Sequence, residues 1–341
     1  MTDTWLDALP ADPRPWLLEP DDPAVRHLAL RGLEDRGEDD PGVIEALARA
    51  MASDPIASIL AAGDPAGWWV KPGPGYGPKY MGTVWSLVFL DQLGADRRDE
   101  RIRTACAYLL GQASTASGGL GSSASARADR PPPPSSVAHC LNGNLLRALI
   151  GFGWLYDERV QRAIEWGASA ITGEGSPRYY ASATSGPGFA CGVNEGLPCA
   201  WGAIKALLGF ARIPADRRSP LVERAVAAGV EFLLSHDPAV ADYPMGWGNT
   251  KPNGSWFKPG FPSGYVADVS QELEVLAELG AANDPRAANA VGWLLAKAGP
   301  DGRWRNEYAY NGKTWSDIER QGGPSKWVTL RACRIVRAAL G

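Results

Sequence analysis

SLVFLDQLGADRRDERIRTACAYLL (86–110) and LLRALIGFGWLYDERVQRAIEWGASAI (145–171) share one pattern: an apolar helix, a short Gly/Asp break and a second helix. Three further segments repeat the pattern in altered form, at 25–51, 204–234 and 273–295. Recurrence of one helix pair along a chain is typical of helical arrays, in which each pair packs against its neighbours. The repeat therefore predicts an all-α fold.

The break between the two helices carries an acidic residue in four copies and a serine in the other. These residues are Asp40, Asp99, Asp157, Asp284 and Ser219. Their spacing is roughly sixty residues, whereas common helical-pair solenoids repeat every ~34–47 residues. The additional residues form loops rich in Gly, Pro and aromatics after the second helix of each pair. Loops that follow the same step gather at one end of an array, so we expect the functional site there.

The two helices of a pair differ in character. The first is nearly all apolar, as at Leu87, Leu90 and Leu93, which predicts a fully buried position. The second mixes core residues such as Ile102 with charged ones such as Arg101. Two concentric layers of helices, with the apolar helices inside, explain this difference. About five to six pairs that close on themselves make an α/α toroid with long loops on one end.

We expect one domain over residues 1–341, with an N-terminal helical portion at 1–60 and the clearest repeats at 61–341. A lone helix at 327–340 would supply a sixth inner element, completed by the N-terminal part of the chain. The pattern leaves open whether the toroid is fully closed, and it does not indicate an oligomeric state.

Composition narrows the class of function. Apolar residues make up 45% of the chain, which is ample for a core, and the net charge of −4 provides no basic stripe for nucleic acid. The N-terminus lacks the cationic start and apolar run of a signal peptide. No run reaches the ~18 apolar residues of a membrane span. We therefore expect a cytoplasmic protein without an integral membrane segment.

Three short motifs carry a resemblance to a known family. They are Gly-Gly-Leu-Gly (118–121), Tyr-Pro-Met-Gly-Trp (243–247) and Asp-Gly-Arg-Trp (301–304). They resemble degenerate forms of the Gly/Trp repeat of the prenyltransferase/squalene-cyclase superfamily, and the resemblance covers most of residues 60–341. It implies an α/α toroid and a terpene cyclase-like enzyme that acts on a hydrophobic isoprenoid in a central cavity.

The superfamily's catalytic motifs are missing from this sequence. There is no Asp-x-Asp-Asp motif, and the nearest acidic run ends at Asp40, which is expected to cap the next helix. There are no paired acidic clusters for magnesium. The three histidines are His27, His139 and His236, and none follows residue 236, although the zinc ligand of a protein prenyltransferase would be expected toward the C-terminus. The resemblance therefore implies a small member without the usual catalytic residues.

An alternative is a zinc site at the starts of the inner helices. If these starts lie at one level of the toroid, His139, Cys140, Cys199 and Asp268 approach one another, with Cys191 in the loop before Cys199. Thiolate, imidazole and carboxylate are the ligands that zinc takes in tetrahedral sites. The predicted metal ligands are Cys140, Cys191, Cys199 and His139. The same cysteines would also suit core packing or nucleophilic and redox chemistry.

Candidate acids come from the same level. Asp268 precedes an apolar inner helix, and a desolvated carboxyl there would have a raised pKa and could act as a general acid. It would equally suit a helix N-cap. Glu272 follows it, and Glu195 is a second acid or a plain loop residue. The predicted catalytic residues are Asp268, Glu195 and Glu272.

Loop aromatics and two asparagines complete the predicted site. Aromatic side chains in Gly/Pro loops either pin the loop to the scaffold or line a cavity mouth. The predicted substrate-binding residues are Trp69, Tyr80, Trp85, Asn142, Asn144, Trp201, Trp256 and Trp327. The expected partner is a hydrophobic small molecule. A non-catalytic scaffold that binds a lipid or a protein remains the third alternative.

Overall fold

The computed structural model describes residues 4–125, 127, 129–175, 185–241, 243–244 and 251–341. In these residues the regular structure is helical, and β-pairing is confined to isolated bridges. Met245, Gly246 and Trp247 of the Tyr-Pro-Met-Gly-Trp motif lie outside the described residues. No described helix is both long and apolar enough to cross a membrane.

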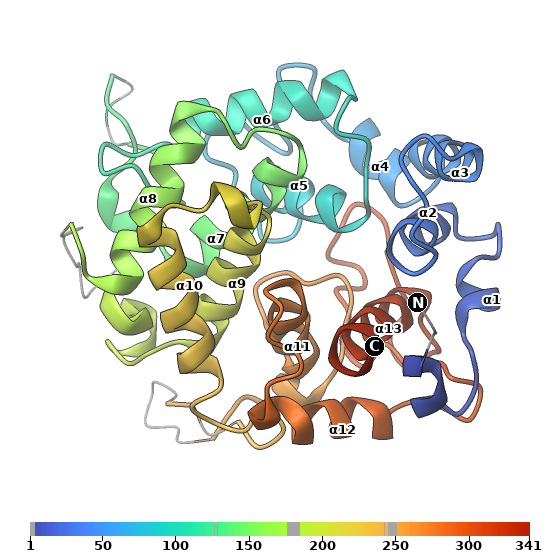
Figure 1. Cartoon of the computed structure of the whole chain (residues 1–341). Coiled ribbons are helices and arrows are strands. Elements are labelled where there is room, and N and C mark those ends of the chain that lie inside the picture. The colour runs from blue at the N-terminus through green and yellow to red at the C-terminus, as the bar shows by residue number, and fades with distance from the viewer. Residues whose placement is uncertain (1–3, 126, 128, 176–184, 242, 245–250) are drawn as a thin grey trace.

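The helices form two concentric rings, which confirms the predicted α/α toroid (Figure 1). The inner ring consists of α2 (Pro23–Gly32), α5 (Thr83–Gln92), α7 (His139–Gly151), α9 (Ala200–Ala211), α11 (Val269–Glu278) and α13 (Lys326–Leu340). The outer helices are α3 (Pro41–Met51), α4 (Ile56–Ala61), α6 (Glu100–Ala113), α8 (Glu158–Thr172), α10 (Pro220–Leu233) and α12 (Ala288–Ala296). The N-terminal segment adds η1 (Thr4–Ala8) and α1 (Arg14–Leu17). Short 3-10 turns are η2 (Pro134–Ser136), η3 (Pro187–Phe189), η4 (Gly192–Asn194), η5 (Ala215–Arg217), η6 (Gly254–Phe257) and η7 (Pro285–Ala287).

Burial follows the predicted difference between the two helices of a pair. In α5 every residue from Thr83 to Leu90 is buried, because neighbours surround the inner helix. In α8 the buried positions include Val160, Ala163 and Ile164, whereas intervening residues are exposed. A helix that is apolar all round belongs inside, and an amphipathic one covers it.

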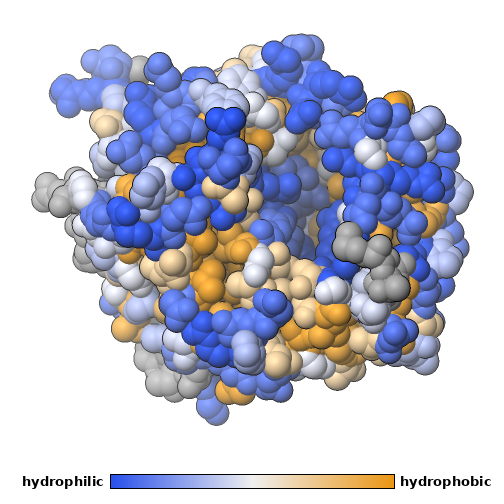
Figure 2. All heavy atoms as spheres, viewed as in Figure 1, coloured by the Kyte–Doolittle hydropathy of each residue, from blue (hydrophilic) through white to orange (hydrophobic). Residues whose placement is uncertain are grey.

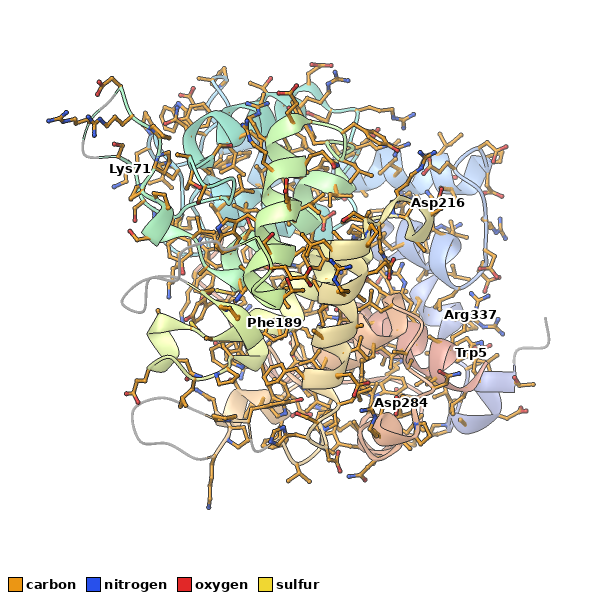
Figure 3. All side chains as sticks on the ribbon, turned by 60° about the vertical axis from the view of Figure 1, so that its left-hand side comes forward. Trp5, Lys71, Phe189, Asp216, Asp284 and Arg337 are labelled. Atoms are coloured by element: carbon orange, nitrogen blue, oxygen red, sulfur yellow. The ribbon has the colours of Figure 1, made fainter. Side chains whose placement is uncertain are left out.

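The acidic breaks are helix caps. Asp99 Oδ1 accepts the backbone N–H of Arg101 at 2.9 Å, and Asp157 Oδ1 accepts that of Arg159 at the same distance. Asp284, labelled in Figure 3 at the edge of the molecule, caps η7 at the start of the last outer segment. Each of these aspartates satisfies an otherwise unpaired N–H and places a negative charge at the helix N-terminus.

The C-terminal helix is completed by the N-terminal segment, as predicted. α13 packs against η1, α1 and α2, and in Figure 1 the two ends of the chain meet on the same side of the ring. Lys326 Nζ lies 3.0 Å from Glu19 Oε2, and Arg334 donates to the carbonyl of Leu28 at 2.7 Å. These contacts join the first and last repeats of the array.

The axis of the toroid is closed at one end by charged side chains. Late residues of the inner helices line a polar pit of about 300 Å³, which includes Arg147 and Glu274. Arg147 Nη2 lies 2.7 Å from Glu274 Oε1, and Arg331 Nε lies 3.0 Å from Glu274 Oε2. Figure 2 shows a hollow at the centre of this face with hydrophilic residues in its depth. Arginines here oppose the negative ends of the inner helices, so this end is held by electrostatics rather than left apolar.

Candidate functional site

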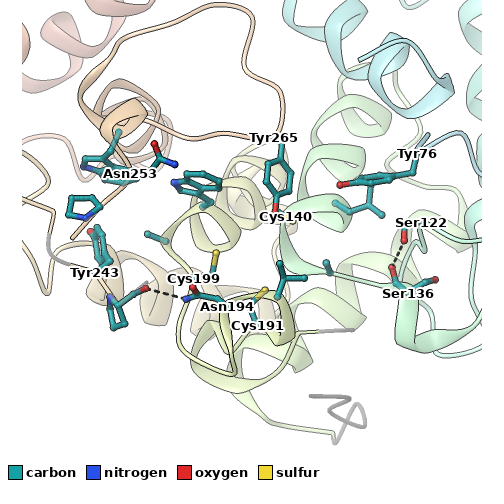
Figure 4. Close-up of a pocket in the computed structure, with 18 residues that line it drawn as sticks. Tyr76, Ser122, Ser136, Cys140, Cys191, Asn194, Cys199, Tyr243, Asn253 and Tyr265 are labelled. Carbon is teal, nitrogen blue, oxygen red and sulfur yellow. Dashed lines mark hydrogen bonds between the residues drawn. The ribbon is translucent and has the colours of Figure 1, made fainter. Parts of the chain in front are cut away.

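A cavity of about 480 Å³ opens at the other end, among the starts of the inner helices and the loops before them. We call it the loop-end cavity. Its lining consists of Tyr76, Ser122, Ser136, Ala138, Cys140, Leu141, Cys191, Val193, Asn194, Cys199, Ala200, Trp201, Tyr243, Pro244, Pro252, Asn253, Trp256 and Tyr265. Figure 4 shows these side chains arranged around the open space. The position agrees with the expectation that loops after the outer helices gather at one end.

Aromatic rings form much of the wall, and other groups hold them in place. Trp201 and Tyr265 meet edge to face with ring centroids 5.7 Å apart. The indole N–H of Trp256 donates to the carbonyl of Pro238 at 2.9 Å, so that ring is fixed with its polar atom satisfied. Lys79 Nζ lies 4.3 Å from the ring centroid of Tyr265, on the side of the loop that precedes α5. These contacts position the rings of Trp201, Trp256 and Tyr265 in the wall.

Three cysteines line this cavity, and all are free thiols. Cys140 lies in the first turn of α7, and Cys199 is the N-cap of α9. The neighbouring thiol of Cys199 lowers the pKa of Cys191 to about 6, against the effect of burial. The backbone of Asn194 and Val193 acts in the same direction. The neighbouring Cys191 and burial raise the pKa of Cys199.

Asp268 lies outside the cavity wall and caps α11. Its Oδ1 accepts the backbone N–H of Gln271 at 3.0 Å and the hydroxyl of Ser270. Burial raises the pKa of Asp268, while Arg331 and these hydrogen bonds oppose that shift. Its geometry is that of the N-cap that the sequence left open as an alternative.

Glu272 is linked to the cavity through Tyr243. The carboxyl is fully buried, and its Oε1 lies 3.1 Å from the hydroxyl oxygen of Tyr243, which also hydrogen-bonds to the carbonyl of Leu233. Burial raises the pKa of Glu272 far above its usual value. In both hydrogen bonds the Tyr243 hydroxyl is the donor, to the carbonyl of Leu233 and to Glu272 Oε1. Glu272 is thus a buried acid one residue away from the cavity.

The other predicted residues fall into two groups. Trp201 and Trp256 line the cavity. Trp69 donates its indole N–H to Ile59 at 2.7 Å, and Trp85 donates to Tyr76 at 2.8 Å, so both support the scaffold. Trp327 stacks on Phe261 with centroids 4.4 Å apart and lines the polar pit instead.

Four other predicted residues also lie outside the described cavity wall: Asn142, Asn144, Tyr80 and Glu195. Asn142 accepts the backbone N–H of Leu120 at 3.0 Å and donates to Ala163, which ties a loop to α7 and α8. Asn144 is buried on α7. Tyr80 packs against Tyr310 with centroids 4.2 Å apart, and Glu195 is an exposed loop residue with φ of 58°.

His139 is separate from the cysteines. Its Nε2 lies 3.0 Å from the carbonyl of Gly186, and its ring packs between Trp166 and Phe189. Burial lowers the pKa of His139 to about 4, so the ring is neutral. Within the described part of the chain, no group of three or more His, Cys, Asp or Glu side chains is arranged to hold a metal ion. Zinc binding stays a prediction from the sequence.

Sequence reasoning missed three tyrosines and two asparagines of the wall: Tyr76, Tyr243, Tyr265, Asn194 and Asn253. A signal was available for two of them. Tyr265 directly precedes the level at which the inner-helix starts align, and Tyr76 lies in the Gly/Pro loop before α5. Tyr243 belongs to the Tyr-Pro-Met-Gly-Trp motif, but nothing in that motif indicates that its hydroxyl meets Glu272.

Comparisons with known proteins concern only the fold of the chain. No family model matches the sequence, and no curated protein matches it. Among solved structures, an unsaturated glucuronyl hydrolase specific for heparin is similar at 13% identity and a TM-score of 0.45, over 96% of this chain and 86% of that one. The type II terpene cyclase MstE from Scytonema is similar at 14% identity and a TM-score of 0.31, over 85% of this chain and 97% of that one. Neither likeness carries an argument about activity.

Proposed function

We propose that the chain binds an uncharged, elongated hydrophobic molecule of isoprenoid type in the loop-end cavity. The observation that carries this proposal is the cavity itself: about 480 Å³ with an aromatic wall. Small-molecule sites typically have volumes of ~300–1,000 Å³ and are mostly apolar with a few polar groups. The described wall has this composition, with Ser, Asn and Tyr hydrogen-bonding groups among apolar side chains.

The charge of the wall narrows the ligand further. None of the described lining residues is Asp, Glu, Lys or Arg. A diphosphate headgroup would lose its hydration there, and none of the described lining residues is a cation that could replace it. A polyprenol or a polyprene hydrocarbon loses little on entry, and each buried CH₂ stabilises the complex by about 0.8 kcal/mol. An uncharged isoprenoid therefore fits better than its diphosphate.

Titration with farnesol and geranylgeraniol, followed by tryptophan fluorescence and calorimetry, tests this proposal. Removal of the wall ring in Trp201→Ala should weaken binding roughly tenfold or more, since an aromatic contact with a ligand contributes ~1–3 kcal/mol. Trp293→Ala is the matched control, because Trp293 is a half-buried tryptophan on outer helix α12, away from the cavity. Equal affinity in both variants, or tighter binding of farnesyl diphosphate than of farnesol, would contradict the proposal.

A cyclase-like activity in this cavity would draw its proton from Glu272. The favouring observation is the buried carboxyl of Glu272, whose pKa burial raises and which Tyr243 connects to the wall. Protonation of an alkene followed by loss of a different proton exchanges hydrogen with solvent. Incubation of geranylgeraniol with the protein in deuterium oxide, with mass spectrometry of the recovered lipid, measures this exchange. We expect hydrogen exchange that disappears in Glu272→Gln and persists in Asp268→Asn. Absence of exchange in the unmodified protein would contradict the cyclase-like activity and leave ligand binding as the only function of the cavity.

A further inference from the structure

The polar pit at the toroid axis, seen as the hollow in Figure 2, is a cavity that the proposed function does not use. Its volume of about 300 Å³ lies at the lower end of the range for small-molecule sites, ~300–1,000 Å³. No described residue lines both the pit and the loop-end cavity, because the two open at opposite ends of the inner helices. The pit is therefore a separate place for a smaller ligand.

Positive side chains outnumber negative ones in the described lining of the pit. The charged lining residues are the arginines Arg147, Arg212, Arg331 and Arg334 and the acids Asp91, Glu274 and Glu278. When all of them are ionised, one positive charge is left over. The C-terminal ends of inner helices add partial negative charge at this end. An anion is thus stabilised only where guanidinium groups reach it directly.

The acids of the pit surround its two buried arginines. Arg147 Nη2 lies 2.7 Å from Glu274 Oε1 and 3.5 Å from Glu278 Oε1. The Nε of Arg147 lies 3.9 Å from Asp91 Oδ2. Arg331 Nε lies 3.0 Å from the second oxygen of Glu274. Most of the negative charge is therefore offset in the depth of the pit, at Arg147 and Arg331.

The other two arginines are exposed residues of the lining and keep unused donors. Arg212 Nη2 lies 3.6 Å from Asp91 Oδ2, which is longer than a hydrogen bond. Arg334 Nη2 donates to the carbonyl of Leu28 at 2.7 Å, and Arg334 forms no ion pair with the described residues. Burial lowers the pKa of Arg334; the pit glutamates oppose this shift, whereas the neighbouring arginines add to it. The mouth of the pit thus holds cations whose charge is incompletely offset.

We propose that the polar pit binds a small organic carboxylate, whose head group is held by the guanidinium groups of Arg212 and Arg334. A guanidinium presents a planar fork of N–H donors that matches a carboxylate, so the two groups suit arginine better than lysine. The body of the ligand contacts apolar side chains of the same wall, among them Leu28, Trp327 and Ile335. A single carboxylate also balances the excess charge of the described lining.

Glu278 provides a test of the sign of the ligand's charge. It lines the same pit with a side chain that is 31% exposed, so its carboxylate repels a bound anion and attracts a bound cation. Burial raises the pKa of Glu278, while the arginines of the pit oppose this shift. Glu278→Gln removes the charge and keeps the size. It should tighten the binding of an anion several-fold, which loss of a merely structural contact would not do.

Calorimetric titration of the full chain with sodium benzoate, benzamide and benzylamine tests the proposal, because these compounds share a ring and differ in charge. We expect benzoate to bind at one site and more tightly than the other two. Arg212→Met and Arg334→Met should each weaken benzoate binding about 10- to 100-fold, the factor for one hydrogen bond to a charged group. Arg103→Met, at an exposed arginine of outer helix α6, is the matched control and should leave the affinity unchanged.

The inference is overturned if benzoate does not bind, if benzamide or benzylamine binds as tightly, or if neither arginine variant weakens benzoate binding. Weaker benzoate binding in Glu278→Gln contradicts it as well. Saturating farnesol and the Trp201→Ala variant separate the two cavities. If either one abolishes benzoate binding, benzoate occupies the loop-end cavity and the inference fails. If farnesol does not bind but benzoate follows the expected pattern, the proposed function fails and the carboxylate site stands.

Discussion

The hydroxyl oxygen of Tyr243 lies 3.1 Å from carboxyl oxygen Oε1 of Glu272, and the two side chains are 3% and 0% exposed. Tyr243 faces the loop-end cavity, whereas Glu272 belongs to inner helix α11. No described group partners the second carboxyl oxygen of Glu272 by a hydrogen bond. A buried carboxyl with so few partners is neutral, and this state makes predictions for stability as well as for chemistry.

Glu272→Gln should be well tolerated, because the amide reproduces the size and the donor of the neutral carboxyl. Glu272→Ala should cost roughly 2–5 kcal/mol in the free energy of unfolding, since it leaves a cavity in the core. The raised pKa of Glu272 sets the pH dependence. Its stabilising contribution is fully present below the unfolded pKa near 4.5 and is lost as pH rises through the folded pKa. Urea unfolding at pH 5 and pH 8 should therefore show the Gln variant gaining on the wild type at the higher pH; a constant difference would contradict a neutral Glu272.

Asp268→Asn should leave the free energy of unfolding and farnesol affinity nearly unchanged, because asparagine is as good an N-cap as aspartate. Asp268→Ala should cost about 0.5–2 kcal/mol for the cap, and more if the buried hydroxyl of Ser270 loses its acceptor. Asp157→Ala, at the half-buried cap of outer helix α8, provides the comparison for cap loss alone. If Asp268→Asn keeps its stability but no longer exchanges deuterium into geranylgeraniol, Asp268 and not Glu272 is the acid.

The fold could be predicted further than the site, for a physical reason. Apolar runs such as that around Leu87 and caps such as Asp157 are local signals. Because they recur in each repeat, an uncertain signal in one copy is supported by the others. The wall of the cavity depends instead on which way individual loop side chains point. Trp69 and Trp201 look alike in sequence, yet Trp69 pins a loop to Ile59 while Trp201 faces the cavity.

Contacts between residues far apart in the sequence could not be predicted either. The alignment of the inner-helix starts does predict that Cys140 and Cys199 lie at one end of the toroid, and both line the cavity there. The placement of Cys191 and Cys199 on one face depends on the bridge between Ala190 and Pro198, which no periodicity of the sequence predicts. The charged residues of the axis were equally hidden, because no local pattern indicates that Arg147 of α7 meets Glu274 of α11.

Glu274→Gln should destabilise the protein by roughly 3–5 kcal/mol at neutral pH, because it leaves Arg147 and Arg331 without their shared carboxylate. Burial alone would raise the pKa of Glu274, but the two arginines outweigh it and lower that pKa to about 2. The contribution is present above the unfolded pKa near 4.5 and is lost as pH falls toward about 2. Urea unfolding at pH 7 and pH 3 should show the deficit of the variant shrinking in acid.

Glu231→Gln is the matched control for that change. Glu231 pairs with Arg286 at 2.9 Å on the surface, where such pairs contribute about 0–1 kcal/mol. Its effect should be small at pH 7. A deficit of similar size in Glu231→Gln and Glu274→Gln would show that the axial network is no stronger than a surface pair.

Lys205 gives a pH dependence of the same sign as Glu274, but in the alkaline range. Its side chain, 1% exposed, reaches from α9 to Gln271 on α11, where burial and the charge of Arg147 lower its pKa to about 7. The folded protein thus releases a proton that the unfolded chain holds up to pH near 10.5. The contribution is complete above the unfolded pKa and is lost as pH falls to about 7, so wild-type stability should rise between pH 7 and pH 9. Lys205→Met should remove that rise in stability. The control Lys297→Met, which removes a half-exposed pair with Glu307, should keep it. If the free energy of unfolding of wild type and Lys205→Met, measured in urea, changes equally with pH across this range, Lys205 stays charged in the core.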